Sequence, residues 1–93
     1  MFTNNQKGLI RGLIYCIQFS NDPVNGVDHV FRVVVDRRAM DASREEYAAA
    51  VDAALSSDEA LSQLIPQPHS EPVIRAFLAA VQKRFADEPS QAG

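Results

Sequence analysis

The sequence changes character at about Asp41, and this change constrains the fold more than any other feature. Before it, two apolar runs rich in β-branched and aromatic residues lie among Gly, Asn and Pro. After it, the chain is rich in alanine, and its apolar residues recur at helical spacing. Strands followed by helices are the order of an α+β domain, so we predict that fold class.

Two runs of alternating residues predict the strands, at 13–20 and 30–36. A loop that contains an Asn-Gly pair joins them at 20–28, and a loop of this length most simply connects antiparallel strands. We therefore predict an antiparallel β-hairpin. A helix remains open for the first run, although Gly8 and Gly12 disfavour it. The fully apolar strand faces are Leu13, Tyr15, Ile17 and Phe19 in the first run and Phe31, Val33 and Val35 in the second.

Helices are predicted from residue 43 onward. Residues 43–46 have the spacing of a capping box, in which a serine and a glutamate satisfy each other's backbone N–H groups. Residues 56–59 repeat this start signal and predict a second, short helix that ends near Ile65. A third helix opens at 70–72, with a proline in its first turn. The apolar stripes are Tyr47, Val51, Ala54 and Leu55 in the first helix and Ile74, Phe77, Leu78, Val81 and Phe85 in the last.

The chain of 93 residues fits one domain. We predict a single α+β domain over residues 1–86, in the order ββααα, followed by a flexible tail at 87–93. A two-stranded hairpin is marginal by itself, so the helices must cover its apolar face. The second face of the hairpin is also apolar, which predicts either that the helices wrap both faces or that a second copy of the chain pairs through the sheet.

Cysteine content and hydropathy bear on the compartment. The single cysteine, Cys16, has no partner for an intramolecular disulfide, which favours the cytoplasm. The apolar stretch at 13–19 is too short for a membrane span, which needs about 20 apolar residues. We expect a cytoplasmic protein that does not enter a membrane.

No set of residues typical of catalysis is apparent. His29 and His69 are far apart in the sequence, and with Cys16 they do not have the spacing of a zinc site. A thiol within an apolar run is usually an inert packing residue. Ser43, like the serines that open the other predicted helices, is explained as a helix cap. We therefore predict a protein that is not an enzyme and that needs no metal or cofactor.

The formal net charge is −3, which disfavours nucleic acid as the main partner. The charge is unevenly distributed. Residues 1–40 carry five basic and three acidic side chains, a net of +2, whereas residues 41–93 carry four basic and nine acidic side chains, a net of −5. A regulator that binds nucleic acid through Arg32, Arg37 and Arg38 remains an alternative.

The acidic half of the chain is the candidate binding surface. Its carboxylates are typical of an electrostatic docking surface for a basic protein, because complementary charge speeds encounter and rejects wrong partners. The plainer interpretation is a set of capped helices with a solvated face. An aromatic residue in the same segment is a candidate anchor if it lies at the rim. The predicted partner-binding residues are Glu45, Glu46, Asp52, Asp58 and Glu59, with Tyr47 as the anchor.

A short acidic chain without a catalytic set, with the apolar opening from Lys7 to Cys16 and acidic helices from Asp41, is similar in type to small bacterial immunity proteins. These proteins neutralise toxins that competing cells deliver, as in contact-dependent growth inhibition. The resemblance implies stoichiometric binding that blocks the active site or substrate groove of a toxin. Many such toxins are nucleases with basic surfaces, which an acidic helical face can mimic. A small homodimeric adaptor protein is the other alternative.

Overall fold

The computed structural model describes residues 2–18, 22, 24–35 and 42–87, with the backbone alone at residues 33 and 35. Within these residues the chain forms helices and helical turns and contains no strand. The elements are α1 (Asn4–Ile17), the 3-10 turn η1 (Val24–Gly26), α2 (Val27–Val30), the π-helical turn η2 (Phe31–Val35), α3 (Arg44–Ser56), the 3-10 turn η4 (Leu61–Gln63) and α4 (Glu71–Asp87).

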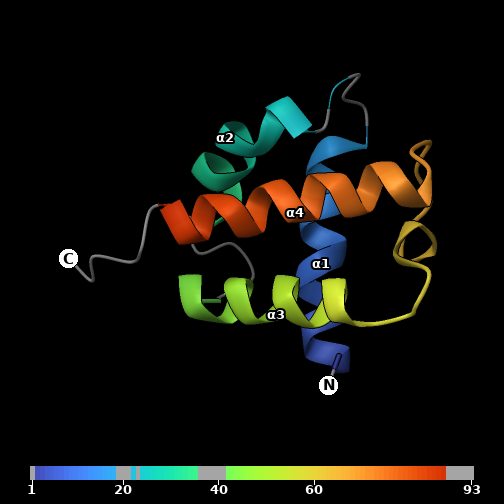
Figure 1. The fold of residues 1–93 in the computed structure, drawn as a ribbon, viewed down its shortest axis with the longest axis horizontal. Coiled ribbons are helices and arrows are strands. Elements are labelled where there is room, and N and C mark those ends of the chain that lie inside the picture. The colour runs from blue at the N-terminus through green and yellow to red at the C-terminus, as the bar shows by residue number, and fades with distance from the viewer. Residues whose placement is uncertain (1, 19–21, 23, 36–41, 88–93) are drawn as a thin grey trace.

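The helices pack in two layers around one core. In Figure 1, α3 and α4 lie side by side and run in opposite directions, and α1 crosses behind them at a steep angle. The helices α1 and α3 are in contact along their crossing, and α3 also contacts α4. The short α2 and η2 cover the other side of α4. Buried residues from all four helices meet in one hydrophobic cluster, so the described residues form a single core.

Helix α1 replaces the first predicted strand. Its N-terminus has a capping box, in which the Thr3 side chain accepts from the Gln6 N–H at 3.1 Å and Gln6 accepts from the Thr3 N–H at 2.9 Å. Tyr15, assigned to the apolar face of the strand, is 60% exposed. The strand at 13–20 is therefore wrong for its described part. The buried residues follow helical spacing instead and are Ile10, Leu13, Ile14 and Ile17.

The second predicted strand is also wrong. Residues 27–35 form α2 and η2, and the buried side chains again recur at helical spacing. Without strands in the described residues there is no β-hairpin, so the α+β fold and the homodimer through a sheet have no basis there. The valines in this segment favour strands, but burial of one helical face outweighs their propensity. The buried residues are Val27, Val30, Phe31 and Val34.

Helix α3 confirms the first of the predicted helices. The Glu46 N–H donates to the Ser43 hydroxyl at 3.1 Å, and the Ser43 N–H donates to the Glu46 carboxylate at 2.9 Å, which is the predicted capping box. The second predicted helix does not form. Ser57 accepts from the Glu59 N–H at 3.3 Å, and only the three residues of η4 are helical before Pro66.

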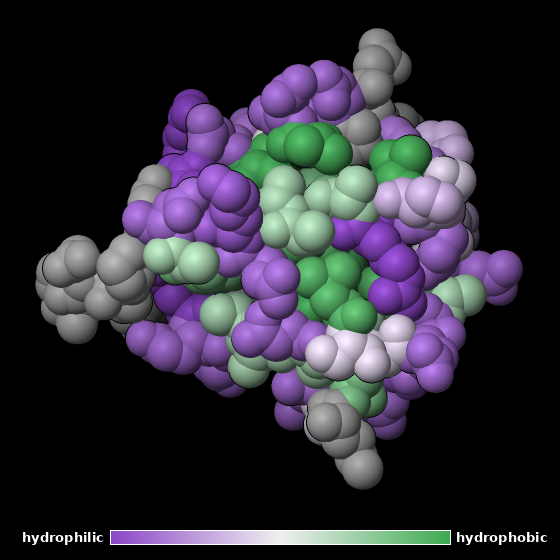
Figure 2. Space-filling view, in the orientation of Figure 1, coloured by the Kyte–Doolittle hydropathy of each residue, from purple (hydrophilic) through white to green (hydrophobic). Residues whose placement is uncertain are grey.

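Helix α4 confirms the last predicted helix and its stripe. Four of the five stripe residues are fully buried, and Phe85 is half-buried. Figure 2 shows apolar side chains between α4 and its neighbours α2 and α3, with polar side chains around them. Asp87 is the last residue of the helix, and the rest of the predicted tail, 88–93, lies outside the described residues.

Gly8 has no structural role inside this fold that requires a glycine. It lies in the middle of α1, and a Cβ atom built at this position would meet no atom within 4 Å. A glycine inside a helix destabilises it by roughly 0.5–1 kcal/mol relative to alanine. We expect Gly8→Ala to raise the free energy of unfolding by about that amount, measured by urea denaturation.

The matched control is Ala49→Gly, at an exposed position of α3, which should lower the stability by a similar amount. A loss of stability in Gly8→Ala would contradict the open environment that the structure gives this residue.

Candidate functional site

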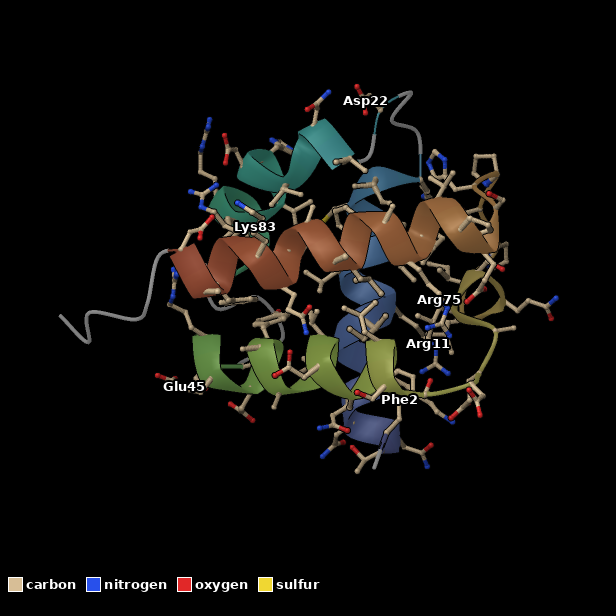
Figure 3. The ribbon with its side chains drawn as sticks, viewed as in Figure 1. Phe2, Arg11, Asp22, Glu45, Arg75 and Lys83 are labelled. Atoms are coloured by element: carbon tan, nitrogen blue, oxygen red, sulfur yellow. The ribbon has the colours of Figure 1, made fainter. Side chains whose placement is uncertain are left out.

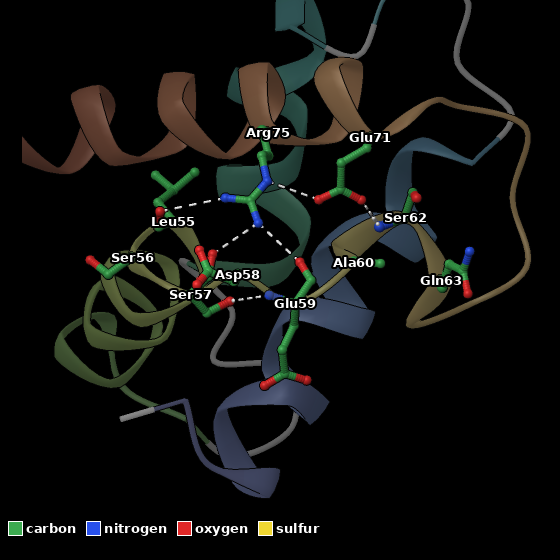
Figure 4. Close-up of a pocket in the computed structure, with 10 residues that line it drawn as sticks. All are labelled: Leu55, Ser56, Ser57, Asp58, Glu59, Ala60, Ser62, Gln63, Glu71 and Arg75. Atoms are coloured by element: carbon green, nitrogen blue, oxygen red, sulfur yellow. Dashed lines mark hydrogen bonds and ion pairs between the residues drawn. The ribbon is translucent and has the colours of Figure 1, made fainter.

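The connection between α3 and α4, here called the α3–α4 loop (residues 57–70), contains the densest polar network among the described residues. Arg75, in α4, donates to the Glu71 carboxylate at 2.8 Å. The same guanidinium donates to the backbone carbonyls of Leu55 at 3.5 Å, Ser57 at 3.0 Å and Glu59 at 2.9 Å. Figure 4 shows these bonds converging on one side chain. Arg75 thus holds the C-terminal end of α3 against α4, because carbonyls there lack partners within the helix.

Glu71 accepts hydrogen bonds from the backbone of η4, whereas Arg75 donates to the backbone. Its carboxylate accepts from the backbone N–H of Leu61 at 3.0 Å and of Ser62 at 2.8 Å. These N–H groups begin a 3-10 turn and have no partner inside that turn. The pair of Glu71 and Arg75, one helical turn apart in α4, therefore fixes the first half of the α3–α4 loop, as far as Ser62.

Helix α1 is attached to the same loop along its length. Lys7 forms an ion pair with Glu59 at 2.8 Å. Arg11 donates to the Leu64 carbonyl at 3.2 Å, and a ring nitrogen of His69 lies 2.9 Å from the Ile17 carbonyl. Figure 3 shows Arg11 and Arg75 reaching toward this region from different helices. The loop is thus fixed by contacts to both α1 and α4.

An open pocket of about 550 Å³ lies over this network. Its polar groups are largely engaged within the protein, since Arg75 already donates to four acceptors. No described residue here pairs a nucleophile with a base. The arrangement therefore supports the shape of the surface and offers no assembled set for catalysis. The lining residues are Leu55, Ser56, Ser57, Asp58, Glu59, Ala60, Ser62, Gln63, Glu71 and Arg75.

The predicted acidic residues divide between α3 and the start of this loop. All five are exposed, and we call them the acidic surface: Glu45, Glu46, Asp52, Asp58 and Glu59. Glu46 is part of the capping box, and Asp52 accepts from the Gln82 side chain at 2.7 Å. Only Glu59 forms a salt bridge with another described residue. Glu45 and Asp58 lie toward opposite ends of α3, as Figures 3 and 4 show.

Tyr47 is not at the rim of this surface. Its exposed fraction is 0%, and its ring belongs to the core between α1, α3 and α4. Burial, followed by the nearby Cys16 and Glu46, raises the pKa of the Tyr47 hydroxyl. An interface anchor must be accessible to the partner, so the structure gives Tyr47 a packing role and leaves the acidic surface without an aromatic anchor.

Cys16 and the histidines supply no site either. Cys16 is half-buried, and burial raises the pKa of its thiol, which disfavours the reactive thiolate. Across the described ranges, no three His, Cys, Asp or Glu residues lie close enough together to hold a metal ion. None of the helices described here combines the length and the apolar character that crossing a bilayer requires.

An aromatic and cationic cluster, which the sequence analysis missed, joins η2 to α4. The rings of Phe31 and Phe85 lie 4.7 Å apart between centroids. The guanidinium carbons of Arg84 and Arg44 lie 5.0 Å and 5.5 Å from the centre of the Phe31 ring. Arg84 also forms an ion pair with Asp28 of α2. The signal in the sequence was the large apolar Phe85 at the end of the α4 stripe, which a neighbouring element must cover.

Comparison with known protein families, with curated proteins and with solved structures finds no match to this chain.

The Glu71 carboxyl gives a pH-dependent prediction. Burial by itself raises the pKa of Glu71, but hydrogen bonds from Ser62, Leu61 and Arg75 outweigh it and lower the pKa below its ordinary value. A lowered native pKa stabilises the fold above the unfolded value of about 4.3, and this stabilisation is lost as the pH falls through the native pKa. We expect Glu71→Gln to lower the free energy of unfolding by about 1–2 kcal/mol at pH 7, allowing for partial exposure.

At a pH below the native pKa of Glu71, the difference between Glu71→Gln and the unsubstituted protein should shrink toward zero. Urea denaturation at both pH values measures this. A difference of the same size at both values would show that the charge of Glu71 is not what stabilises the loop.

Tyr47 gives a second prediction, about packing. Tyr47→Ala removes a fully buried ring from the core and should lower the free energy of unfolding by about 3–5 kcal/mol. The matched control is Tyr15→Ala, because Tyr15 is 60% exposed and its removal should change the stability by about 0.5 kcal/mol or less. Equal losses at the two positions, measured by thermal or urea denaturation, would contradict the burial of Tyr47.

Proposed function

We propose that this chain is a cytoplasmic protein-binding protein without catalytic activity, which neutralises a basic partner by binding it through the acidic surface. The described residues offer no assembled catalytic set, whereas they display five exposed carboxylates along α3 and the start of the α3–α4 loop. The role fits the resemblance to immunity proteins, which act by stoichiometric binding. A toxin that recognises nucleic acid is the class of partner with the matching charge.

Asp58 is the observation that carries this proposal. It is exposed and follows the C-terminal end of α3, where the helix dipole is already negative. A carboxylate at that end is unfavourable for the helix, and no basic residue lies in the last turn of α3. Asp58 forms no ion pair with a described residue, unlike Glu59, which pairs with Lys7. The described contacts give Asp58 no part in stabilising the fold, and attraction of a cationic partner is the role that we propose for it.

The carboxylates at the other end of α3 extend the same potential. Glu45 and Glu46 occupy the first turn of α3, where the helix dipole favours them. The helix has 13 residues, so its two ends lie about 20 Å apart at 1.5 Å per residue. A negative potential spread over this length matches a groove that binds a nucleic-acid backbone, because phosphates also repeat along such a groove.

Attachment of the loop to α1 and α4 favours tight binding. Lys7, Arg11 and His69 fix the loop to α1, and Arg75 fixes it to α4. Asp58 is therefore held in place before a partner arrives, which reduces the entropy lost on binding. Arg32 is exposed in η2, but Arg37 and Arg38 lie outside the described residues. The cationic cluster of Arg44 and Arg84 is engaged within the fold, over the ring of Phe31 and, through Arg84, with Asp28.

Neutralising three members of the acidic surface tests the proposal. The variant Glu45→Gln, Asp52→Asn and Asp58→Asn leaves Glu46 in its capping box and Glu59 in its ion pair. Tagged protein is used to capture partners from a lysate of its host. We expect a basic polypeptide to be retained by the unsubstituted protein and to associate about tenfold more slowly with the variant at low salt. The activity of that polypeptide should fall when one equivalent of the chain is added.

The matched control adds the same charge elsewhere. Lysines in place of Ala76, Ala79 and Ala86 change the net charge by +3 on the exposed face of α4, and partner binding should remain. If the three proteins bind the polypeptide equally, the acidic surface is not the interface. If the captured polypeptide keeps its full activity in the complex, binding occurs without neutralisation.

A further inference from the structure

The segment Val30–Val35 has a sequence that conflicts with its helical structure. Four of its six residues are valine, one is phenylalanine, and it contains neither proline nor glycine. Valine is among the weaker helix formers and the stronger strand formers. The segment nevertheless forms the end of α2 and the π-helical turn η2, and a π-helix is a rare backbone form. A conflict between local preference and native structure makes the native conformation of a segment depend on its tertiary contacts.

Tertiary contacts hold the segment in its helical form. The buried side chains of Val30, Phe31 and Val34 anchor it in the core. The ring of Phe31 packs at a tilt against Phe85, with 4.7 Å between ring centroids, and the guanidinium of Arg84 covers the Phe31 ring at 5.0 Å. Arg84 in turn is paired with Asp28. The aromatic and cation–π contacts meet at Phe31, so removal of that ring from the core would leave only the buried valines to hold the segment.

The alternating sequence determines what the released segment would present. In an extended backbone, Phe31, Val33 and Val35 would share one face, which is wholly apolar. Arg32, the only charged residue of the six, would lie on the opposite face. Short segments with high strand propensity, low charge and no proline pair into sheets whose apolar faces then interlock. In the native fold Arg32 is exposed, so its charge makes no described contact that the fold requires.

We propose that Val30–Val35 is a conformational switch segment: when Phe31 leaves the core, the segment becomes a strand and pairs with the same segment of a second copy of this chain. Backbone N–H and C=O groups released from α2 and η2 find partners in the second copy, which lowers the free energy of the assembled state. Arg32 opposes the pairing, because like charges on stacked strands repel one another. The native fold stays helical, and the strand exists only in the assembled state.

The first experiment loosens the contacts around Phe31 in the full chain. Arg84→Ala removes the cation over the ring and the pair with Asp28. We expect the opened population to rise about tenfold, a change of about 1.4 kcal/mol. The lag before thioflavin fluorescence appears in moderate urea should shorten accordingly. The matched control is Lys83→Ala, which removes an exposed cation one residue away and should leave the lag unchanged. Equal lags in both variants would overturn the proposal.

The second experiment keeps the fold intact by changing only the exposed Arg32. Arg32→Val and Arg32→Ala remove the same charge, but valine favours strands and alanine favours helices. We expect Arg32→Val to assemble several times faster than Arg32→Ala, with far-ultraviolet circular dichroism changing from helix to sheet. Equal acceleration would mean that loss of charge alone promotes aggregation, and this would contradict the proposal.

Hydrogen exchange of the assemblies then locates the strand. Backbone N–H groups of Val30–Val35 should be the most protected in the assembled state. Maximum protection in α1, whose sequence also alternates over 13–17, would overturn the assignment to η2.

Discussion

The connection between α3 and α4 depends on one pair of side chains, Glu71 and Arg75. Their ion pair joins two successive turns of α4, while each partner also binds backbone of the α3–α4 loop. Arg75 supplies donors to carbonyls that the end of α3 leaves unpaired, and Glu71 supplies an acceptor to N–H groups that begin η4. An irregular loop carries many such groups, and each is costly if buried without a partner. Two residues of α4 therefore allow a long connection to pack tightly.

The pair of Glu71 and Arg75 also positions the part of the acidic surface that lies in the α3–α4 loop. Asp58 and Glu59 lie in the part of the loop that Arg75 holds, since its guanidinium binds the carbonyls on either side of Asp58. The ion pair of Lys7 and Glu59 ties the same segment to α1. The surface proposed to bind a partner is thus built on the contacts of three helices. Charge alone attracts a partner, but a fixed arrangement of charge is what selects among partners.

The sequence predicts the two helices that combine an end signal with a long apolar stripe, whereas the start signal at 56–59 alone leads to a helix that does not form. The capping box at Ser43 and the clean stripe of α4 lead to the correct helices, because these signals are local. The two strand predictions are wrong because a short apolar run can fit both the alternation of a strand and the spacing of a helix. The run from Ile10 to Ile17 has helical spacing and also alternates in part, and the two interpretations differ at Tyr15, which is exposed, and at Ile14, which is buried. The capping box at Thr3 was the overlooked signal for α1.

Some features of the candidate site can likewise be predicted from the sequence, and others cannot. Exposed carboxylates are predictable because charged side chains rarely enter a core, and all five in the acidic surface are exposed. The burial of Tyr47 is not predictable from its neighbours in sequence, because it depends on where α1 crosses α3. The partners of Arg75 are likewise distant in sequence, up to twenty residues away, and backbone carbonyls leave no trace in a sequence.

The two tyrosines differ in exposure, and this difference makes the intrinsic fluorescence of the protein sensitive to unfolding. The chain has no tryptophan and two tyrosines, one buried in the core and one 60% exposed. Tyr15 already contacts solvent in the native state, so its emission changes little when the chain unfolds. Tyr47 moves from an apolar surrounding into water in the same transition. The intrinsic fluorescence of the protein therefore follows the crossing of α1 and α3, without any attached dye.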